Sequence, residues 1–334
     1  MFCFIYSIVK LDMDKIKKNN SSKEIKIKKI SILTPCFNEV ENVVELTERI
    51  RLAVAKLPYD YEHIFIDNCS TDGTVDKLRI LAANDKKIKV ILNTRNFGAV
   101  TSPYYGVLQS YADACIMIPS DLQDPPEMIP DFLKKWEKGY KIALAVRTDT
   151  EASKVGNFLR KAYYRLLNKA SDTMLINDAT GSGLYDQQVI KILRSLNDPY
   201  PYFRGLLCEI GFPIAKVFYT QQKRKLGATK HNFFSLLNEG ILGLVKQSKL
   251  PVRLFTIIGG VSSAVSFVIA ISYFIAKLMF WNTFSVGVAP LIIGFFFIMG
   301  IQLLGLGLIG EYTLINLAHA RKMPLVVEAE RINF

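Results

Sequence analysis

Short apolar runs alternate with segments of helical periodicity along the first half of the chain. The apolar runs predict five strands, at 29–34, 63–67, 89–93, 114–118 and 141–146. The periodic segments predict helices at 39–56, 73–84, 102–112 and 126–138. Because strands that alternate with helices form βαβ units, this pattern predicts an α/β fold with a mainly parallel sheet flanked by helices.

Two long stretches without charged residues, 254–276 and 278–310, follow near the end of the chain. Each reaches the ~20 residues that a membrane-spanning helix needs. A turn rich in aromatic residues, at 280–285, separates them and suits the depth of a membrane interface. We predict two transmembrane helices within 252–311, joined as a hairpin. The alternative is a buried pair of helices in a soluble domain.

Two amphipathic segments, 155–169 and 232–249, combine apolar positions with lysine or arginine. Such a pattern is typical of a surface helix, and it also suits a helix at the bilayer surface. Because the second segment runs into the first predicted span, we predict an interfacial helix over 231–251. The other predicted units are a basic tail at 1–28, an α/β domain at 29–230 and a tail at 312–334.

The distribution of charge orients the predicted hairpin. The chain of 334 residues has a formal net charge of +12. Basic residues flank the two spans on their outer sides, at Lys246, Lys249, Arg253, Arg321 and Lys322. The positive-inside rule then places both ends of the hairpin, and the α/β domain, in the cytoplasm. The five cysteines lack a Cys-x-x-Cys pair and zinc spacing, which fits reduced thiols in that compartment.

The sequence Asp-Leu-Gln-Asp-Pro-Pro-Glu at 121–127 follows the predicted strand 114–118. It therefore lies at the carboxyl end of a strand, where open α/β sheets bind ligands. Its acids and the amide of Gln123 suit a hard cation such as Mg²⁺ or Mn²⁺, and such a metal implies a phosphate-bearing substrate. The alternative is a turn and helix start, with an acid at the cap and proline in the first turn.

Two other strand ends carry candidate nucleotide-binding residues. Phe37 is placed to stack on a base, Glu39 to accept hydrogen bonds from ribose hydroxyls, and Asp67 to read a nucleobase donor edge. The alternatives are local: a turn with Asn38 near a helix cap, and capping of the next helix by Ser70 and Thr71.

The loop at 220–230 is rich in lysine and arginine. These side chains bind phosphate by charge and by paired donors, although a run of charge is more often simply solvated. The Gly-x-Gly-x-x-Gly sequence at 305–310 lies inside the second predicted span. It therefore favours close packing of helices over dinucleotide binding.

The ordered set of motifs resembles membrane-anchored family 2 glycosyltransferases of the polyprenyl-phosphate type. This group includes dolichol-phosphate mannose synthases and the bacterial enzymes that charge undecaprenyl phosphate for O-antigen and envelope modification. The matching pieces are TPCFNEVENV at 34–43, DNCSTDGT at 67–74, RNFGAVTSPYYG at 95–106, SDLQDPPEMIP at 120–130, Arg-x-x-Gly-x-Thr-Lys at 224–230, the two-span hairpin and GEY at 310–312.

The resemblance implies a GT-A fold and an inverting, metal-dependent transfer of a sugar from a UDP- or GDP-linked donor to polyprenyl phosphate. It implies a bacterial inner-membrane protein with a cytoplasmic catalytic domain, and a role in cell-envelope glycans such as lipopolysaccharide. The expected partners are the nucleotide sugar, the lipid phosphate and the membrane, without nucleic acid. A homo-oligomer is left open.

The resemblance also implies a task for each of four groups of residues. The nucleoside is expected to be held by Pro35, Phe37, Glu39 and Asp67. A metal ion, Mg²⁺ or Mn²⁺, on the donor diphosphate is expected to be held by Asp121 and Gln123. The phosphate of the lipid is expected to face Arg147 and Arg160. The donor phosphates are expected to be clamped by Arg224 and Lys230.

Several positions depart from the family pattern. Pro119 stands where the family usually has an acid, so one metal or donor contact is expected either to be missing or to be replaced by Ser120 or a water. Asn68 stands in place of the second acid of an Asp-Asp pair. The segment 178–186 lacks an arginine that is common in related chains, which leaves the role of Asp178 open.

The residues leave three hypotheses about function. A lipid phosphate is already ionised at pH 7, so direct displacement of the nucleoside diphosphate needs little general-base help. If the acceptor is instead a hydroxyl of a lipid-linked saccharide, a base is needed, and Asp178 is the candidate. The third hypothesis is a non-catalytic, membrane-tethered nucleotide-binding partner, which Pro119 and Asn68 favour and the retained Asp121 and Arg147 oppose.

Overall fold

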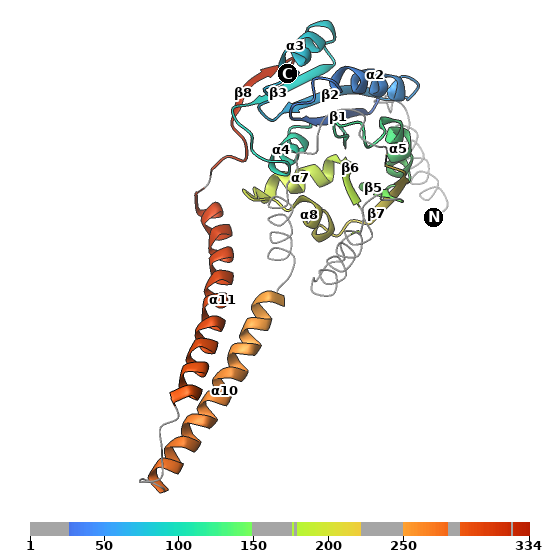
Figure 1. Cartoon of the computed structure of the whole chain (residues 1–334). Coiled ribbons are helices and arrows are strands. Elements are labelled where there is room, and N and C mark those ends of the chain that lie inside the picture. The colour runs from blue at the N-terminus through green and yellow to red at the C-terminus, as the bar shows by residue number, and fades with distance from the viewer. Residues whose placement is uncertain (1–26, 149–175, 177–178, 222–249, 280–287, 322) are drawn as a thin grey trace, which may run out of the picture.

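The computed structural model describes residues 27–148, 176, 179–221, 250–279, 288–321 and 323–334. Within these residues, the strands form an eight-stranded sheet with the order β7-β5-β6-β4-β1-β2-β3-β8 (Figure 1). The strands are β1 (Lys29–Cys36), β2 (Asp60–Asp67), β3 (Ile88–Asn93), β4 (Ala114–Met117), β5 (Ile142–Arg147), β6 (Ala179–Asp186), β7 (Ile214–Tyr219) and β8 (Glu328–Ile332). The five strands predicted from the apolar runs correspond to β1 to β5 and are confirmed.

Parallel pairing gathers the strand ends at one edge of the sheet. β1 pairs in parallel with β2 and β4, β2 with β3, and β5 with β7. β6 runs antiparallel between β4 and β5, so its amino end lies beside their carboxyl ends. The predicted α/β fold with a mainly parallel sheet is therefore confirmed, and the architecture is that of the GT-A fold.

Helices cover both faces of the sheet (Figure 1). One face carries α2 (Val43–Val54), α3 (Thr74–Asn84), the short 3-10 turn η1 (Pro126–Met128) and α5 (Ile129–Glu137). The other face carries α4 (Thr101–Leu108), α7 (Gln187–Leu196) and α8 (Phe203–Glu209). Strands covered on both faces need nearly continuous apolar runs, which explains why β1 to β5 are visible in the sequence.

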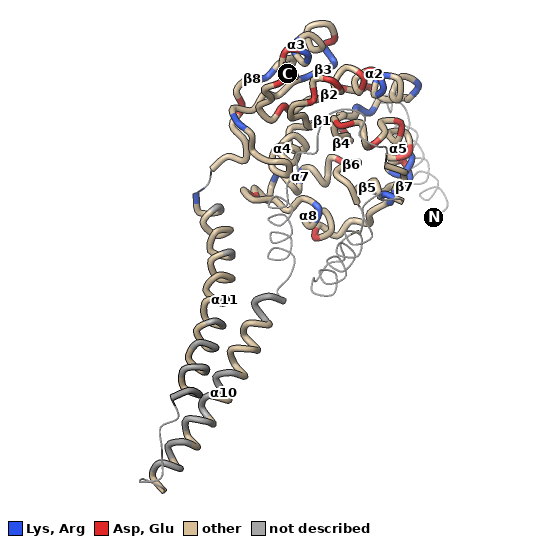
Figure 2. Tube along the Cα trace, viewed as in Figure 1, with Lys and Arg blue, Asp and Glu red and all other residues tan. Residues whose placement is uncertain are grey.

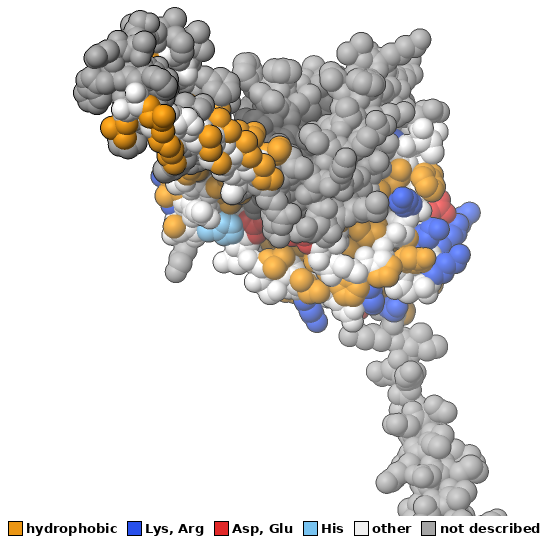
Figure 3. Space-filling view, turned by 90° about the horizontal axis from the view of Figure 1, so that it is seen from below, with side chains coloured by type: hydrophobic (Ala, Val, Ile, Leu, Met, Phe, Trp, Pro, Cys, Tyr) orange, Lys and Arg blue, Asp and Glu red, His pale blue; other side chains and the backbone are white. Residues whose placement is uncertain are grey.

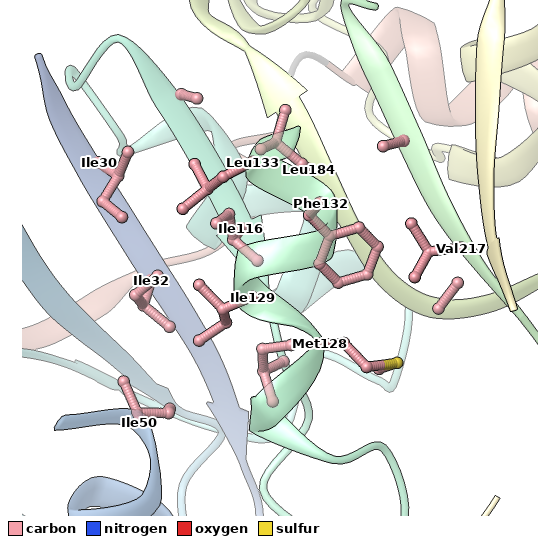
Figure 4. Packing of buried hydrophobic residues seen from close by; sticks show 14 of the residues in the cluster. Ile30, Ile32, Ile50, Ile116, Met128, Ile129, Phe132, Leu133, Leu184 and Val217 are labelled. Carbon is pink, nitrogen blue, oxygen red and sulfur yellow. The ribbon is translucent and has the colours of Figure 1, made fainter. Parts of the chain in front are cut away.

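The core packs on both sides of β1. On one side Ile30 and Ile32 lie with Ile116 of β4 and Phe132 of α5 (Figure 4). On the other side, Leu33 contacts α4 so closely that a Cβ added to Gly106 would lie 2.8 Å from the Leu33 side chain. Glycine thus lets α4 approach β1 and fixes the position of the chain that leads into it.

The region 179–219 contains four elements that the apolar pattern did not predict: β6, α7, α8 and β7. β6 has the sequence Ala-Thr-Gly-Ser-Gly-Leu-Tyr-Asp, which shows no apolar alternation. A Cβ added to Gly183 would lie 2.9 Å from the carbonyl oxygen of Ala143, so this strand needs glycine where it meets β5. Glycine at position 183 is therefore required by the packing, although glycine is a residue type that argues against a strand in the sequence.

Two long apolar helices, α10 (Leu250–Met279) and α11 (Val288–Arg321), extend away from the domain and contact one another (Figure 1). The charged residues among those described gather on the domain, whereas the described parts of the two helices contain few (Figure 2). By length and composition, one described stretch, Ile301–Arg321, could cross a membrane. The predicted pair of spans stays a prediction.

The end of α11 and the segment after it return to the domain. His319 Nε2 lies 3.7 Å from Asp198 Oδ1, on the α7–α8 connection. Figure 3, which shows this face, has a histidine beside an acidic side chain. Residues 328–332, within the predicted tail 312–334, form β8 and pair antiparallel with β3. No pattern in the sequence predicts this strand, because alternating charged residues in a short segment also suit a solvated tail.

Candidate active site

The candidate site is built from the loops at the carboxyl ends of β1, β2, β4 and β5. The register pairs Cys36 of β1 with Asp67 of β2, so the ends of these two strands are side by side. Arg147, the last residue of β5, pairs with Tyr219 of β7. Pro35 lies in β1 and Phe37 directly follows it, and both side chains are half-buried.

Asp67 is held in a tight turn at the end of β2. Its side chain is almost completely buried, with 1% of the residue exposed. It accepts hydrogen bonds from the Ser70 amide at 2.9 Å and the Ser70 hydroxyl at 2.5 Å. Burial raises the pKa of Asp67, although the hydrogen bonds from Ser70 oppose that rise.

This turn contradicts the alternative that Ser70 caps the following helix. The cap of α3 is Gly73, which makes no side-chain capping bond, and Ser70 binds Asp67 instead. The Ser70 hydroxyl also accepts from the backbone amide of Asn38, at 2.8 Å. The two strand-end turns are thereby fixed to one another by hydrogen bonds between the loops after β1 and β2.

Glu39 is buried just after β1. Its backbone amide donates to the Thr74 hydroxyl at 2.9 Å, and its carboxylate accepts from Asn42 Nδ2 at 2.6 Å. Asn38 has a φ of 55°, and it precedes α2 by several residues. Asn38 is therefore part of a left-handed turn, rather than the cap of α2, and its side chain accepts from the Thr71 amide at 2.7 Å.

The acidic loop after β4 divides its residues between the interior and the surface. Leu122 has a φ of 57° and is 3% exposed, so an unfavourable backbone conformation is held by burial of its side chain. Asp121 and Gln123, on either side of it, are half-buried. The backbone N–H of Gln123 donates to Asp121 Oδ1 at 3.2 Å. The loop thus keeps the two predicted metal ligands toward the accessible edge of the sheet.

Asp124 differs from Asp121 in its surroundings. It is buried and accepts from the Ser182 hydroxyl of β6 at 2.6 Å and from the Tyr219 hydroxyl of β7. The cap of η1 is Pro125. Asp124 therefore does not cap this turn: its carboxylate joins the acidic loop to two other strands. Glu127, the last acid of the motif, is exposed and pairs with Arg49 of α2.

Arg147 carries an unsatisfied donor at the same edge. Its Nη1 donates to Gln221 Oε1 at 2.8 Å, while its buried Nε finds no hydrogen-bond acceptor within the described parts of the chain. A buried guanidinium N–H without an acceptor is costly and suits an anionic ligand. Tyr219 pairs with Arg147 in the sheet, and its hydroxyl donates a hydrogen bond to Asp124. Tyr219 therefore links Arg147 to the acidic loop.

The residues present are compatible with a small hard cation. Among residues 27–148, 179–221 and the described C-terminal segments, no group of three or more His, Cys, Asp or Glu could hold a metal alone. Mg²⁺, however, is usually held by one or two carboxylates together with substrate phosphates and water. One carboxylate and one amide, those of Asp121 and Gln123, fit that donor set. Ser120 is buried beside them.

Four predicted site residues lie outside the described residues: Arg160, Asp178, Arg224 and Lys230. Their predicted tasks therefore stay predictions.

Asn68 is a site residue whose role the sequence did not indicate. Its Oδ1 accepts from the Phe97 amide at 2.9 Å and from Asn93 Nδ2 at 3.1 Å. Its Nδ2 donates to Asn96 Oδ1 at 2.8 Å and to the Gly98 carbonyl at 3.3 Å. An aspartate could not donate these last two bonds. The amide thus holds the loop that follows β3, next to Asp67.

Comparison with known proteins identifies the family. A profile of glycosyl transferase family 2 matches residues 31–193. The putative glycosyltransferase CsbB of Bacillus subtilis (strain 168) is 34% identical over 284 residues, which cover 85% of this chain and 86% of that protein. The chain belongs to glycosyl transferase family 2. This family 2 glycosyltransferase is therefore an enzyme of the class that its motifs predict.

Two further similarities extend the comparison. The bactoprenol glucosyl transferase of Shigella phage SfV is 32% identical over 287 residues, which cover 85% of this chain and 92% of that protein. Among solved structures, glucosyl-3-phosphoglycerate synthase of Mycobacterium tuberculosis, in complex with Mn²⁺, UDP and phosphoglyceric acid, matches with a TM-score of 0.47 and 17% identity. That match covers 65% of this chain and 76% of the other.

Proposed function

We propose that this family 2 glycosyltransferase moves a sugar from a nucleoside diphosphate to a polyprenyl phosphate at the cytoplasmic face of a bacterial inner membrane. The observation that carries the proposal is the similarity to a bactoprenol glucosyl transferase over 287 residues. An alignment of that length must extend well beyond the 31–193 region of the family profile. The similarity therefore includes much of the C-terminal part as well as the sugar-transferring domain.

The donor nucleoside is proposed to lie over the ends of β1 and β2, against Pro35, Phe37, Glu39 and Asp67. Support comes from the hydrogen bonds that fix the two turns, because a site already in its binding geometry loses little entropy when a ligand binds. Asp67, in its deprotonated form, would accept hydrogen bonds from a base edge. The donor phosphates are assigned to Arg224 and Lys230. Either UDP or GDP suits these contacts.

A divalent cation, Mg²⁺ or Mn²⁺, is proposed at Asp121 and Gln123. When bound, it would neutralise the charge that develops on the leaving diphosphate. The residues of the chain supply the rest: Leu122 holds the loop, and Asp124 anchors it to β6 and β7. This anchoring would keep Asp121 in place where position 119 has no acid.

The acceptor phosphate is proposed to face Arg147 and Arg160. The buried Nε of Arg147 supports this assignment, since a phosphate oxygen would satisfy it. A phosphate oxygen would then attack the anomeric carbon from the side opposite the diphosphate, which inverts the configuration. A phosphate monoester is largely ionised at pH 7, so the reaction requires no general base. Asp178 would become necessary only with a hydroxyl acceptor.

Membrane anchoring is proposed to bring the domain and the lipid together. Ile301–Arg321 could cross a bilayer by length and composition. We further propose a first span in α10, which would make the protein multi-pass, with the basic residues around the spans on the cytoplasmic side. Fixing the domain at the surface where the lipid phosphate lies would favour the reaction by proximity.

The test is a transfer assay on membranes that contain the full-length chain. They are incubated with undecaprenyl phosphate, Mg²⁺ and a panel of UDP- and GDP-sugars, and the lipid product is weighed by mass spectrometry. We expect a hexosyl phospholipid that disappears with a chelator and with Asp121→Asn. The control is Asp131→Asn, an exposed acid on α5 that pairs only with nearby Lys134 among the described residues.

Two other outcomes decide against the proposal. Transfer to a lipid-linked saccharide, with none to undecaprenyl phosphate, would establish the hydroxyl acceptor and give Asp178 the role of base. Binding of neither UDP nor GDP by a folded protein would rule out transfer from either donor and favour a non-catalytic, membrane-tethered partner whose nucleotide site has decayed.

A further inference from the structure

The C-terminal segment enters the sugar-transferring domain directly after α11 ends at Arg321. β8 pairs antiparallel with β3 and forms that edge of the sheet. On its outer side, Arg79 of α3 makes a two-point ion pair with Glu330, with N–O distances of 3.0 and 2.5 Å. Asn333 Nδ2 donates to the carbonyl oxygens of Ala82 and Ile88, at 2.6 and 2.8 Å. The strand is therefore attached at several independent points.

The same segment also contacts α4. The Tyr105 hydroxyl donates to Glu328 Oε1 at 2.8 Å, and Arg331 Nη2 donates to Gln109 Oε1 at 2.7 Å. Leu325 packs against the hydrophobic cluster that includes residues of α4. β3 and α4 are the two elements on either side of the loop 94–100. The C-terminal segment therefore fixes both ends of this loop.

The first residue of the loop is bonded to the segment itself. Thr94 donates its amide and its hydroxyl to the carbonyl oxygen of Val327, at 3.0 and 3.1 Å. The other side of the loop is held by Asn68, through Asn96, Phe97 and Gly98. Asn68 directly follows Asp67 in the chain. A movement of the loop would therefore displace Asn68, and with it the neighbouring carboxylate of Asp67.

We propose that residues 325–333 are a positioning element for the nucleotide site: together with Asn68, they hold the loop 94–100 beside Asp67. Nucleotide affinity then depends on a strand that follows α11, the candidate membrane helix. This inference rests on the proposed function, because it takes the nucleoside to bind at Asp67. It adds that the site is complete only when the segment beyond the membrane helix is docked on β3.

The test measures binding of UDP and of GDP, each with Mn²⁺, to the full-length chain in lipid nanodiscs by calorimetry. Thr94→Val removes the hydroxyl bond to Val327 and keeps the branched shape, whereas Thr94→Ser keeps the hydroxyl. Asn68→Asp removes the two donations to the loop. We expect roughly 3-fold weaker binding for Thr94→Val, near wild-type binding for Thr94→Ser and roughly tenfold weaker binding for Asn68→Asp.

The matched control is Arg79→Ala, which breaks the outer ion pair of β8 and does not touch the loop. We expect its nucleotide affinity to stay within about 2-fold of wild type, because exposed ion pairs contribute little. In turnover assays, Thr94→Val and Asn68→Asp should raise the KM for the donor and leave kcat nearly unchanged. A double variant should show an effect different from the product of the single ones, since both act on one loop.

The outcomes separate this inference from the proposed function. If the wild type binds nucleotide and Thr94→Val and Asn68→Asp bind equally well, the positioning role is wrong and the proposed function stands. An equal loss of affinity in Thr94→Val and Arg79→Ala would also overturn it, because it would indicate general loosening of β8. If the wild type binds neither nucleotide, the proposed function fails.

Discussion

The turn after β2 and the loop after β4 each present a carboxylate at the same edge of the sheet, in opposite settings. Asp67 is 1% exposed and accepts two hydrogen bonds from Ser70. Asp121 is half-buried on a loop whose shape depends on the buried side chain of Leu122. Burial raises the pKa of Asp67. The first setting suits recognition of a neutral base edge, and the second suits a hydrated cation.

The same contrast recurs inside the acidic loop. Asp121 is half-buried, Asp124 is buried against Ser182 and Tyr219, and Glu127 is exposed and paired with Arg49. Residue type and spacing make the three acids look equivalent in the sequence. Their neighbours show that Asp124 anchors the loop and that Glu127 lies at the surface, whereas the part of Asp121 in the chemistry is our proposal. Each of the three roles can be tested separately.

The largest expected effect comes from comparing Asp121→Ala with Asp67→Ala. Asp121→Ala should lower kcat by about 100-fold or more, because it removes stabilisation of charge that develops in the transition state. Asp67→Ala should mainly raise the KM for the nucleotide sugar, because its proposed contact exists before and during transfer alike. Steady-state kinetics on the lipid product measures both. A similar fall in kcat for both variants would remove the distinction between the two carboxylates.

Asp124→Asn should destabilise the fold more than it alters the chemistry. The neutral amide keeps one acceptor oxygen and replaces the other by an NH2 group, so the two charge-assisted hydrogen bonds from Ser182 and Tyr219 cannot both persist, which costs roughly 2 kcal/mol of unfolding free energy. Thermal unfolding in detergent measures this change. In a double-mutant cycle with Tyr219→Phe the two losses should not add, because both remove one hydrogen bond. Additive losses would show that Asp124 and Tyr219 act independently.

His63 should make stability depend on pH in a region that lacks proposed ligands. It is buried in β2, with its Nε2 2.9 Å from the Thr34 hydroxyl, and burial lowers its pKa from 6.5 to about 3. The folded state therefore holds fewer protons there, so His63 stabilises the fold fully above pH 6.5. That stabilisation is lost as pH falls toward 3, at about 1.4 kcal/mol per pH unit.

The measurement for His63 compares unfolding of wild type and His63→Gln at pH 7.5 and 5.5. The wild type should lose about 1.4 kcal/mol more than the variant over this interval, since roughly one unit lies below pH 6.5. Equal losses would mean that His63 is accessible to protons in the folded state.

Glu127→Gln should have the smallest effect. Its pair with Arg49 is partly exposed, and breaking such a pair costs about 0.5 kcal/mol. Transfer activity should stay at the wild-type level, because Glu127 faces α2 and not the strand-end site. A large loss of activity would extend the site to the whole acidic motif, and Arg49→Ala would then show whether the ion pair is responsible.

The site was only partly predictable, for a physical reason that particular residues illustrate. The strand ends that carry Asp67 and Asp121 could be found because each follows an apolar run. The tasks of Asp124 and Asn68 could not, because their partners lie in β6, β7 and the loop after β3. The identity of an aspartate or an asparagine does not show whether its side chain binds a ligand or anchors a loop, because that depends on partners distant in the sequence.

The sequence by itself determined the α/β fold, the strand ends that form the site, the membership of glycosyl transferase family 2 and the apolar C-terminal stretches. These follow from local periodicity and from contiguous motifs, which need no knowledge of distant contacts. Only the tertiary structure decided that β6 inserts antiparallel and that residues 328–332 complete the sheet beside β3. Pairings of that kind depend on packing between segments that are far apart in the chain. Glycine at position 183 allows β6 to approach β5, and the ion pair between Arg79 and Glu330 joins β8 to α3. Local sequence patterns do not predict such contacts.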